Sequence, residues 1–183
     1  MSTTQPSNHA SGFTPLNIAV LTVSDTRTDT TDTSGHALAE RATSSGHHVV
    51  AKEIVKDDIY QLRYIISKWI LDPNIHAIIS TGGTGFTPRD NTLEAIQPLF
   101  DKRVEGFGEL FRHISFTQIG TSTVQSRAFA GMANQTVIFC VPGSTNACKT
   151  AWDAIIKEQL DGAHKPCNFI PHLNLADNCQ HRG

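Results

Sequence analysis

The sequence lacks both an excess of one charge and any long hydrophobic run, and each absence excludes a class of protein. Its 183 residues include 15 lysines and arginines against 17 aspartates and glutamates, which gives a net charge of −2. This balance gives no reason to expect binding to nucleic acid or to an anionic membrane surface. No apolar stretch approaches the ~20 residues that a membrane-spanning helix needs. We therefore expect a globular protein whose partners include neither nucleic acid nor a membrane.

Cysteine is also scarce, and its spacing argues against zinc and disulfide scaffolds. The four cysteines contain no C-x-x-C pair, which favours reduced structural cysteines and a cytoplasmic location. Residues 1–15 lack the basic start and apolar stretch of a signal peptide, and we expect a flexible tail there. Residues 166–183 are expected to form a loose C-terminal tail, because their histidines and cysteines match no zinc spacing. One domain is then expected over residues 16–165.

Strands and helices are predicted to alternate along this domain. Apolar, β-branched runs predict buried strands at 16–23, 47–55, 76–81 and 136–141. Periodic apolar positions and capping residues predict helices at 33–45, from 59 to Pro73, at 92–97 and from Ser144 to about Leu160. Continuous apolar strands that alternate with helices indicate a three-layer α/β fold, with a mostly parallel sheet and helices on both faces.

The stretch from Lys102 to Asn134 gives a weaker pattern. A turn at Gly106 is expected to enter a helix, and Thr121–Met132, rich in small residues, is expected to form another. Several aromatic residues gather between 107 and 116 without an evident strand or helix partner. We expect part of this region to be buried between subunits of a trimer or a dimer of trimers. The alternative is that these aromatic side chains fill the core of the monomer.

The most informative segment is Gly-Gly-Thr-Gly-Phe-Thr-Pro-Arg-Asp, which occupies Gly82–Asp90 between a strand and a helix start. A glycine-rich turn leaves backbone N–H groups uncovered at the positive end of a helix, where they bind anions. We expect this role for Gly82, Gly83, Thr84 and Gly85. The carboxylate of Asp90 could hold a metal ion. The motif is neither a Walker P-loop nor a dinucleotide fingerprint, and a tight strand–helix connection is the structural alternative.

Ligands of such folds bind beyond the carboxyl ends of the strands, and other segments are expected at that edge. These are Ser24-Asp25-Thr26, Asp57-Asp58 and Pro142-Gly143-Ser144. The first loosely resembles a flavodoxin-type phosphate loop, although a solvated loop explains it equally well. One aspartate of the second pair suffices to cap the following helix, which leaves the other spare. The third precedes a helix N-terminus that can bind an anion, with its serine as an ordinary cap.

Five segments carry the motifs of one known family. They are Val23–Arg27, Asp32–Gly35, Ser80–Asp90, Val104–Glu109 and Pro142–Ser144. Together they resemble the MoaB/Mog family of molybdenum cofactor biosynthesis proteins. Segments 120–127 and 165–173 are similar to the MoaB branch in particular, and the resemblance runs from about residue 17 to residue 173. The long glycine–proline–acid motif is the specific part of the match.

The resemblance implies a molybdopterin-binding domain that is trimeric, or hexameric in the MoaB branch. Active members join AMP from ATP to the terminal phosphate of molybdopterin and release pyrophosphate, and two aspartates serve that reaction. Asp90 matches the one that ends the glycine motif. The other follows a Val-Pro pair in the family; here the proline is Lys56, which leaves Asp57 and Asp58 as alternatives. Some MoaB-branch proteins have lost such residues and are inactive, whereas this chain keeps its glycine motif intact.

The expected function is therefore an Mg²⁺- and ATP-dependent molybdopterin adenylyltransferase. Asp57 and Asp90 are the expected catalytic and metal-binding residues, since Mg²⁺ between them would stabilise the charge on departing pyrophosphate. The glycine turn and the helix at Ser144 are expected to hold two anionic groups, and the sequence leaves open which is pterin and which is nucleotide. The runner-up is a molybdopterin-binding or carrier protein without turnover. A flavodoxin-like FMN carrier is a third interpretation.

Overall fold

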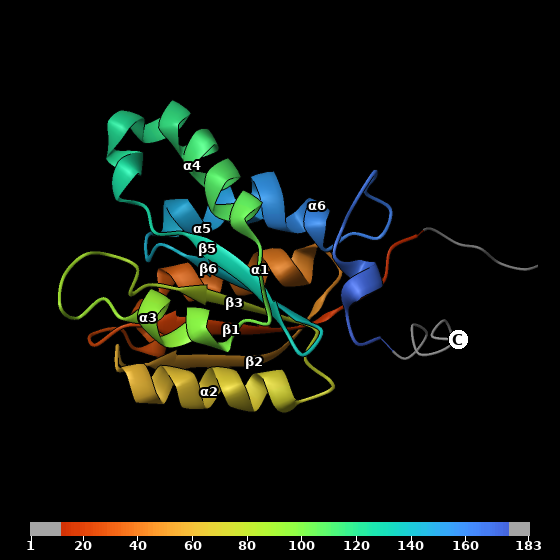
Figure 1. Ribbon diagram of the computed structural model, residues 1–183, viewed down its shortest axis with the longest axis horizontal. Helices are drawn as coiled ribbons and strands as arrows, with labels where there is room; N and C mark the ends of the chain where they lie inside the picture. Colours follow the sequence, from red (N-terminus) through yellow and green to blue (C-terminus); the bar gives the residue numbers. More distant parts are fainter. Residues whose placement is uncertain (1–11, 176–183) are drawn as a thin grey trace, which may run out of the picture.

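A six-stranded sheet forms the centre of the computed structural model, which describes residues 12–175 (Figure 1). The strand order is β2-β1-β3-β6-β5-β4. Four neighbouring strands run parallel: β1 (Asn17–Val23), β2 (His48–Val55), β3 (Ala77–Thr81) and β6 (Thr136–Val141). The fifth, β5 (Phe129–Ala133), runs antiparallel to both β6 and the short edge strand β4 (Lys102–Arg103). The predicted mostly parallel sheet is confirmed.

Helices cover both faces of this sheet, as the three-layer prediction requires (Figure 1). One face packs against α1 (Thr33–Ser44), α4 (Glu105–Ile119) and α5 (Thr145–Ala151), which continues through a π-helical turn into α6 (Lys157–Gln159). The other face packs against α2 (Ile59–Leu71) and the short α3 (Thr92–Ile96). The carboxyl ends of the parallel strands therefore share one edge, where the loops that follow them meet.

Alternation along the central strands divides the core in two. Ile79 and Phe139 lie in the cluster beneath α1, α4 and α5, whereas Ile78 and Ile138 lie in the cluster beneath α2 and α3. Successive side chains of a strand point to opposite faces of the sheet, so a strand covered on both sides must be apolar throughout. This explains why the buried strands appear in the sequence as unbroken hydrophobic runs.

The predicted helix over 121–132 is wrong. The chain forms a 3-10 helix, η3 (Gly120–Gln125), and then enters β5. Ala128 and Ala130 belong to one core cluster while Phe129 belongs to the other, which is the period of a strand. Small residues suit this strand because the Phe100 ring lies against Gly131, where a Cβ atom would collide with it. The short period was hidden because so few of these residues are large and apolar.

Two of the aromatic side chains between residues 107 and 116 are buried, and one is exposed. Phe107 and Phe111 are buried in the monomer, where the Phe107 ring centre lies 5.1 Å from that of Phe139. For these two the alternative interpretation is confirmed. Phe116 differs, because 57% of it is exposed on the outer surface of α4. Of these three aromatic residues, only Phe116 remains available for the predicted contact between subunits, and it lies on the outer side of α4.

The C-terminal segment is packed where a loose tail was expected from residue 166. Leu173 is only 1% exposed, and the Phe169 ring centre lies 5.9 Å from that of Phe139. Pro171 lies between these two apolar side chains, and the segment after Gly162 has too few apolar residues to show the period of a helix or a strand. Residues 176–183 of this expected tail lie outside the described residues. Of the expected N-terminal tail, Phe13 packs on His47 at 5.2 Å between ring centres, and residues 1–11 lie outside the description.

Candidate functional site

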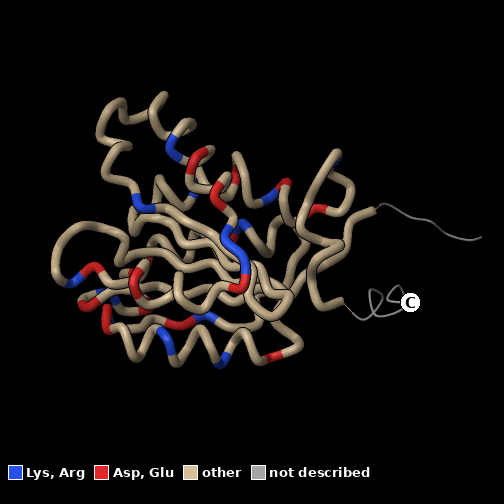
Figure 2. Tube along the Cα trace, viewed as in Figure 1, with Lys and Arg blue, Asp and Glu red and all other residues tan. Residues whose placement is uncertain are grey.

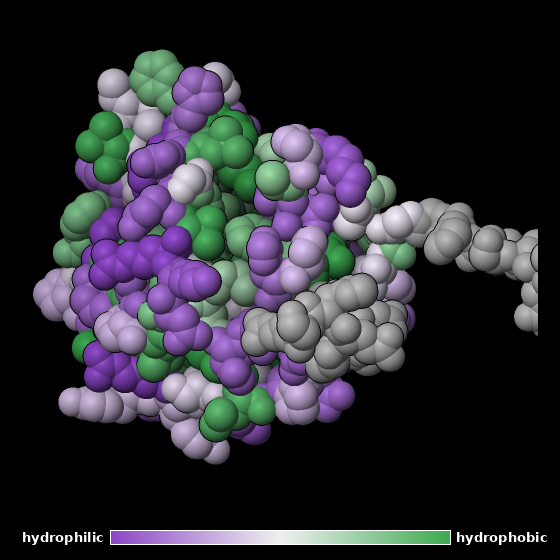
Figure 3. All heavy atoms as spheres, turned by 45° about the vertical axis from the view of Figure 1, so that its right-hand side comes forward, coloured by the Kyte–Doolittle hydropathy of each residue, from purple (hydrophilic) through white to green (hydrophobic). Residues whose placement is uncertain are grey.

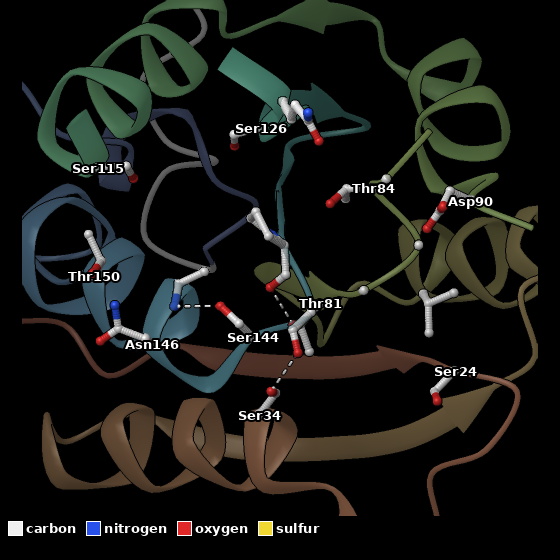
Figure 4. A pocket seen from close by; sticks show the side chains of 18 of the residues that line it. Ser24, Ser34, Thr81, Thr84, Asp90, Ser115, Ser126, Ser144, Asn146 and Thr150 are labelled. Carbon is white, nitrogen blue, oxygen red and sulfur yellow. Dashed lines mark hydrogen bonds between the residues drawn. The ribbon is translucent and has the colours of Figure 1, made fainter. Parts of the chain in front are cut away.

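A cavity of about 530 Å³ opens at the carboxyl edge of the parallel strands, between the loops after β1, β3 and β6 (Figure 4). Most of the residues predicted for the site line it: Ser24, Gly82, Gly83, Thr84, Gly85, Asp90, Pro142, Gly143 and Ser144. Asp25, Thr26 and Asp57 do not line it, although Asp57 lies directly behind the glycine turn. The structure therefore brings three loops together that are up to 120 residues apart in sequence.

The glycine turn has a backbone that only glycine adopts easily. Gly82 and Gly83 have φ angles of +100° and +63°. A Cβ atom on Gly82 would collide with the Val23 carbonyl, and one on Gly83 would collide with Thr92 and the Asp57 carboxylate. The two glycines thus allow the turn to approach the end of β1 and the aspartate behind it.

Only part of the turn's backbone is available to an anion. The N–H of Gly82 donates to the Val141 carbonyl at 3.1 Å, which extends the β3–β6 ladder by one residue. The N–H of Gly85 is directed at the Asp90 carboxylate. Within residues 12–175, the N–H groups of Gly83 and Thr84 donate to no acceptor. Two of the four predicted amides, rather than all four, are therefore free for a ligand.

The carboxylate of Asp90 belongs to the glycine loop and not to helix α3. It accepts hydrogen bonds from the Thr87 N–H at 2.9 Å and from the Thr87 hydroxyl at 2.6 Å. The hydroxyl, helped by backbone amides, holds the pKa of Asp90 below its usual value. Helix α3 has Asn91 as its N-cap residue, without a capping side chain. Capping therefore does not explain why an acid stands at position 90.

The two neighbouring aspartates after β2 have different roles. Asp58 caps α2, since its carboxylate accepts from the N–H groups of Tyr60 and Gln61 at 3.0 and 2.9 Å. Asp57 is only 7% exposed and accepts from the Asn91 N–H at 2.9 Å. Its position against the glycine turn makes Asp57, rather than its neighbour, the candidate for chemistry.

The electrostatic environment of Asp57 is unfavourable for a charge. Burial raises the pKa of Asp57, and the nearby carboxylates of Asp90 and Asp25 act in the same direction, against the hydrogen bonds from Asn91. In Figure 2 several Asp and Glu positions lie on the loops at this edge of the sheet, with Lys and Arg positions among them. A buried carboxylate among other carboxylates is stabilised when a cation binds beside it.

The loop after β1 is tied to the glycine loop by an ion pair. The Asp25 carboxylate lies 2.6 Å from a guanidinium nitrogen of Arg89, which holds the pKa of Asp25 below its ordinary value. The same carboxylate accepts from the Asp57 N–H at 3.2 Å. The Ser24 hydroxyl accepts from the Thr26 N–H at 3.2 Å and closes a local turn. The contacts of Asp25 and Thr26 therefore shape the loops around the cavity, and neither side chain lines it.

The turn before α5, Pro142-Gly143-Ser144, packs against the glycine turn and lines the cavity beside it. Ser144 is the N-cap of α5 and accepts from the Ala147 N–H at 3.1 Å. The Gly143 carbonyl accepts from the Ser34 hydroxyl of α1 at 2.9 Å. A Cβ atom on Gly143 would lie 3.2 Å from the Gly82 Cα atom, so glycine permits close contact between the two turns.

The far half of the cavity was missed by the sequence analysis. It is lined by uncharged polar side chains of α4, η3 and α5, with the segment after η3 (Figure 4): Ser115, Gln118, Ser122, Gln125, Ser126, Asn146 and Thr150. The side-chain oxygen of Gln118 accepts from Asn146 at 3.3 Å and from Thr150 at 3.0 Å, which orients its amide. These polar residues are spread over 36 positions, from Ser115 to Thr150, and form no recognisable motif, so little in the sequence marks this half of the cavity.

The donor set at the glycine turn fits Mg²⁺ that arrives with a phosphate ligand. Among the residues that the structure describes, no group of three or more His, Cys, Asp or Glu side chains could hold a metal ion. Asp57 and Asp90 supply two carboxylates close enough to interact electrostatically. Mg²⁺ in proteins is commonly held by one or two carboxylates together with waters and substrate phosphates. The site thus suits a metal shared with a substrate better than a permanently bound ion.

Comparisons with known proteins agree with this geometry. Residues 19–162 match the family model described as a probable molybdopterin binding domain. Molybdenum cofactor biosynthesis protein B of Escherichia coli is 56% identical over 161 residues, which cover 88% of this chain and 95% of that protein. A crystal structure of a Molybdenum cofactor biosynthesis protein B superposes with a TM-score of 0.78 at 40% identity, covering 80% of this chain and 92% of the other. The tungsten cofactor synthesizing protein MoaB from Pyrococcus furiosus superposes with a TM-score of 0.71 at 38% identity, covering 79% and 92%.

Proposed function

Because the chain belongs to the MoaB/Mog family of molybdenum cofactor biosynthesis proteins, we propose that its cavity transfers AMP from ATP to the terminal phosphate of molybdopterin. A role in molybdenum cofactor biosynthesis follows from the family itself. The observation that supports the reaction is the buried Asp57, which caps no helix and lies with Asp90 beside two free backbone amides. A protein that only held a pterin would have no need of two carboxylates at its phosphate site.

The proposed reaction exchanges one phosphorus–oxygen bond for another. An oxygen of the molybdopterin phosphate attacks the α-phosphorus of ATP, the bond to the β-phosphate breaks, and pyrophosphate leaves with the electron pair. Such transfers depend on positioning and on charge stabilisation more than on a protein nucleophile. The amides of Gly83 and Thr84 would donate to a phosphate oxygen. Mg²⁺, when bound at Asp57 and Asp90, would neutralise charge on the departing pyrophosphate.

The two halves of the cavity suit different parts of the substrates. The uncharged amides and hydroxyls between Ser115 and Thr150 match the amine and carbonyl edge of a pterin ring, which is also uncharged. The half with Gly83, Thr84 and Asp90 matches phosphate groups accompanied by Mg²⁺. We therefore propose that the pterin ring lies toward α4 and the phosphates lie at the glycine turn.

A direct assay tests this function. Purified protein is mixed with molybdopterin, ATP and Mg²⁺, and both adenylylated molybdopterin and pyrophosphate are measured. The proposal expects both products in equal amounts, and expects neither when Mg²⁺ is removed with a chelator. Pterin binding without either product would instead support a carrier protein of the same pathway. A colourless purified protein would dispose of the FMN-carrier interpretation.

Assembly and location belong to the same proposal. Four large apolar side chains remain exposed on α4 and η3: Leu110, Phe116, Ile119 and Val124. Figure 3 shows apolar surface at the top of the molecule, where α4 lies. Exposed apolar surface of this kind is typical of a subunit contact, and we propose a homotrimer or a hexamer. Cys140, Cys148 and Cys167 form no disulfide, which is consistent with the proposed cytoplasmic location. Among the described residues, no helix is long and apolar enough to cross a membrane.

A further inference from the structure

Arg127 reaches across from the segment before β5 and contacts the glycine motif at several points. Its Nε atom donates to the Thr84 carbonyl at 3.0 Å, and one terminal nitrogen donates to the Asp90 carbonyl at 3.0 Å. The other terminal nitrogen donates to a carboxylate oxygen of Glu94 at 2.6 Å. The guanidinium carbon lies 5.2 Å from the centre of the Phe86 ring. A single side chain thus contacts both ends of the irregular loop between β3 and α3.

The first and last residues of this loop also bond to β6 and to Asp57, but the other contacts of the stretch between Thr84 and Asp90 are local or exposed. Thr87 bonds to Asp90 within the loop itself. Arg89 pairs with Asp25, but 67% of the Arg89 side chain is exposed, and solvent-exposed ion pairs contribute little to stability. The Arg127 side chain is only 18% exposed. Its bonds are therefore less screened by water and restrict the loop more strongly.

We propose that Arg127 is a positioning residue for the proposed adenylyl transfer, and this inference rests on that function. Arg127 bonds the backbone carbonyls of Thr84 and Asp90 and so holds the backbone of these two residues at a set separation. Thr84 carries one of the free amides, and Asp90 carries the proposed metal-binding carboxylate. Both groups must act on the same phosphate chain, and a misplacement of about 1 Å can cost roughly 10²-fold in rate. Only the planar guanidinium fork can direct donors at both carbonyls while it stacks on a ring.

A purely structural role for Arg127 gives different expectations. In that case its value would lie in the ion pair with Glu94, and removal would lower stability without a separate effect on the site. Glu94→Gln removes this ion pair and leaves the bonds to Thr84 and Asp90 in place. Substituting Arg127 and substituting Glu94 therefore separate the positioning role of Arg127 from its role in the ion pair.

The test compares Arg127→Lys with two control variants. Arg63→Lys is the matched control, because Arg63 also donates to Glu94, at its carbonyl, and stacks on Tyr60, but is not bonded to the glycine loop. Glu94→Gln is the second control. For each variant we would measure the melting temperature, molybdopterin affinity, kcat, the Mg²⁺ concentration for half-maximal rate, and the rise in melting temperature caused by Mg²⁺ with ATP.

Arg127→Lys is expected to keep molybdopterin affinity within about threefold and to lower kcat by about 10- to 100-fold. The half-maximal Mg²⁺ concentration should rise several-fold, and the thermal shift caused by Mg²⁺ with ATP should shrink by at least half. Both controls should resemble the wild type in all of these measurements. If Arg127→Lys is unfolded at the assay temperature, Arg127→Gln is compared with the wild type and both controls at a lower temperature at which all of these proteins are folded.

Two results would overturn the inference. The first is wild-type kcat and a wild-type Mg²⁺ response in Arg127→Lys. The second is a loss that Glu94→Gln reproduces, since the ion pair alone would then explain it. Failure of the proposed function has a different signature, because the wild type would itself form no product. In that case the thermal shift caused by Mg²⁺ with ATP still decides whether Arg127 positions the site.

Discussion

Replacing Asp57 by asparagine is expected to stabilise the protein and to abolish its turnover. Asp57 is buried, and its carboxylate faces the negative charges of Asp90 and Asp25. Asparagine has the same shape, and its carbonyl oxygen can still accept from the Asn91 N–H. The substitution therefore removes a charge that is unfavourable in the absence of a cation, and keeps the hydrogen bond that orders the turn.

The sign and the pH dependence of this stabilisation follow from the direction of the pKa shift. We expect a gain of about 1 kcal/mol in unfolding free energy, which is within the ordinary range for a single substitution. For a chain of this length it raises the melting temperature by roughly 2–4 °C. Because the pKa of Asp57 is raised on folding, the wild type is penalised above that pKa and recovers as the acid is protonated. The advantage of Asp57→Asn should thus be largest at neutral pH and disappear as the pH falls toward 4.

Thermal denaturation from pH 4 to pH 8, with and without Mg²⁺ and ATP, measures these effects. The wild type should gain stability from Mg²⁺ with ATP, because a ligand that binds only the folded state stabilises it, whereas Asp57→Asn should gain much less. Turnover should fall on the order of 10²-fold or more, the scale of losing one preorganised electrostatic group. Asp58→Asn is the matched control and should keep its turnover, since Asn caps α2 equally well. A variant that is less stable than the wild type at pH 7, or that keeps its turnover, would refute the reasoning.

Three further outcomes are expected. Asp90→Asn should lose turnover on the order of 10²-fold while keeping pterin affinity, and should lower the unfolding free energy by about 1 kcal/mol because it accepts the Thr87 donors less strongly; wild-type turnover would contradict the metal assignment. Ser80→Ala should match or exceed the wild type in urea denaturation by up to about 1 kcal/mol, since the buried Ser80 hydroxyl has no hydrogen-bond partner among the described residues. Light scattering at micromolar concentration should give the mass of a trimer or hexamer, and a monomer would remove the role proposed for Phe116 and its neighbours.

The fold was predictable where one physical pattern dominated. Strand β6 was predicted residue for residue over Thr136–Val141, because an apolar run bounded by a polar start and Pro142 has few alternatives. Helix α2 was predicted from its three-and-four apolar repeat. Strand β5 was missed because three of its five residues are alanine or glycine, and its pairing with β6 is a tertiary effect that local sequence does not record.

The sequence predicted which loops form the site, but not which of their amides and side chains are free to contact a ligand. The sequence identified the glycine turn and an aspartate at 57 or 58, and the geometry separates a helix cap from a buried carboxylate. It could not identify Arg127, whose contacts join residues 33 to 43 positions apart, nor the polar half of the cavity on α4. These features depend on how distant segments pack, and neither has a local periodicity.

The combination of charges at the glycine turn narrows which ligand suits it. An anion held by the amides of Gly83 and Thr84 also meets the negative field of Asp57 and Asp90. Two amide dipoles do not compensate two nearby carboxylates, so a bare phosphate would be disfavoured there. A phosphate that brings its own divalent cation reverses the sign of this interaction, because the cation binds the carboxylates that would otherwise repel the anion. We therefore propose that the turn takes the Mg²⁺ complex of a nucleotide rather than the free phosphate of a stored pterin, in line with the proposed adenylyl transfer.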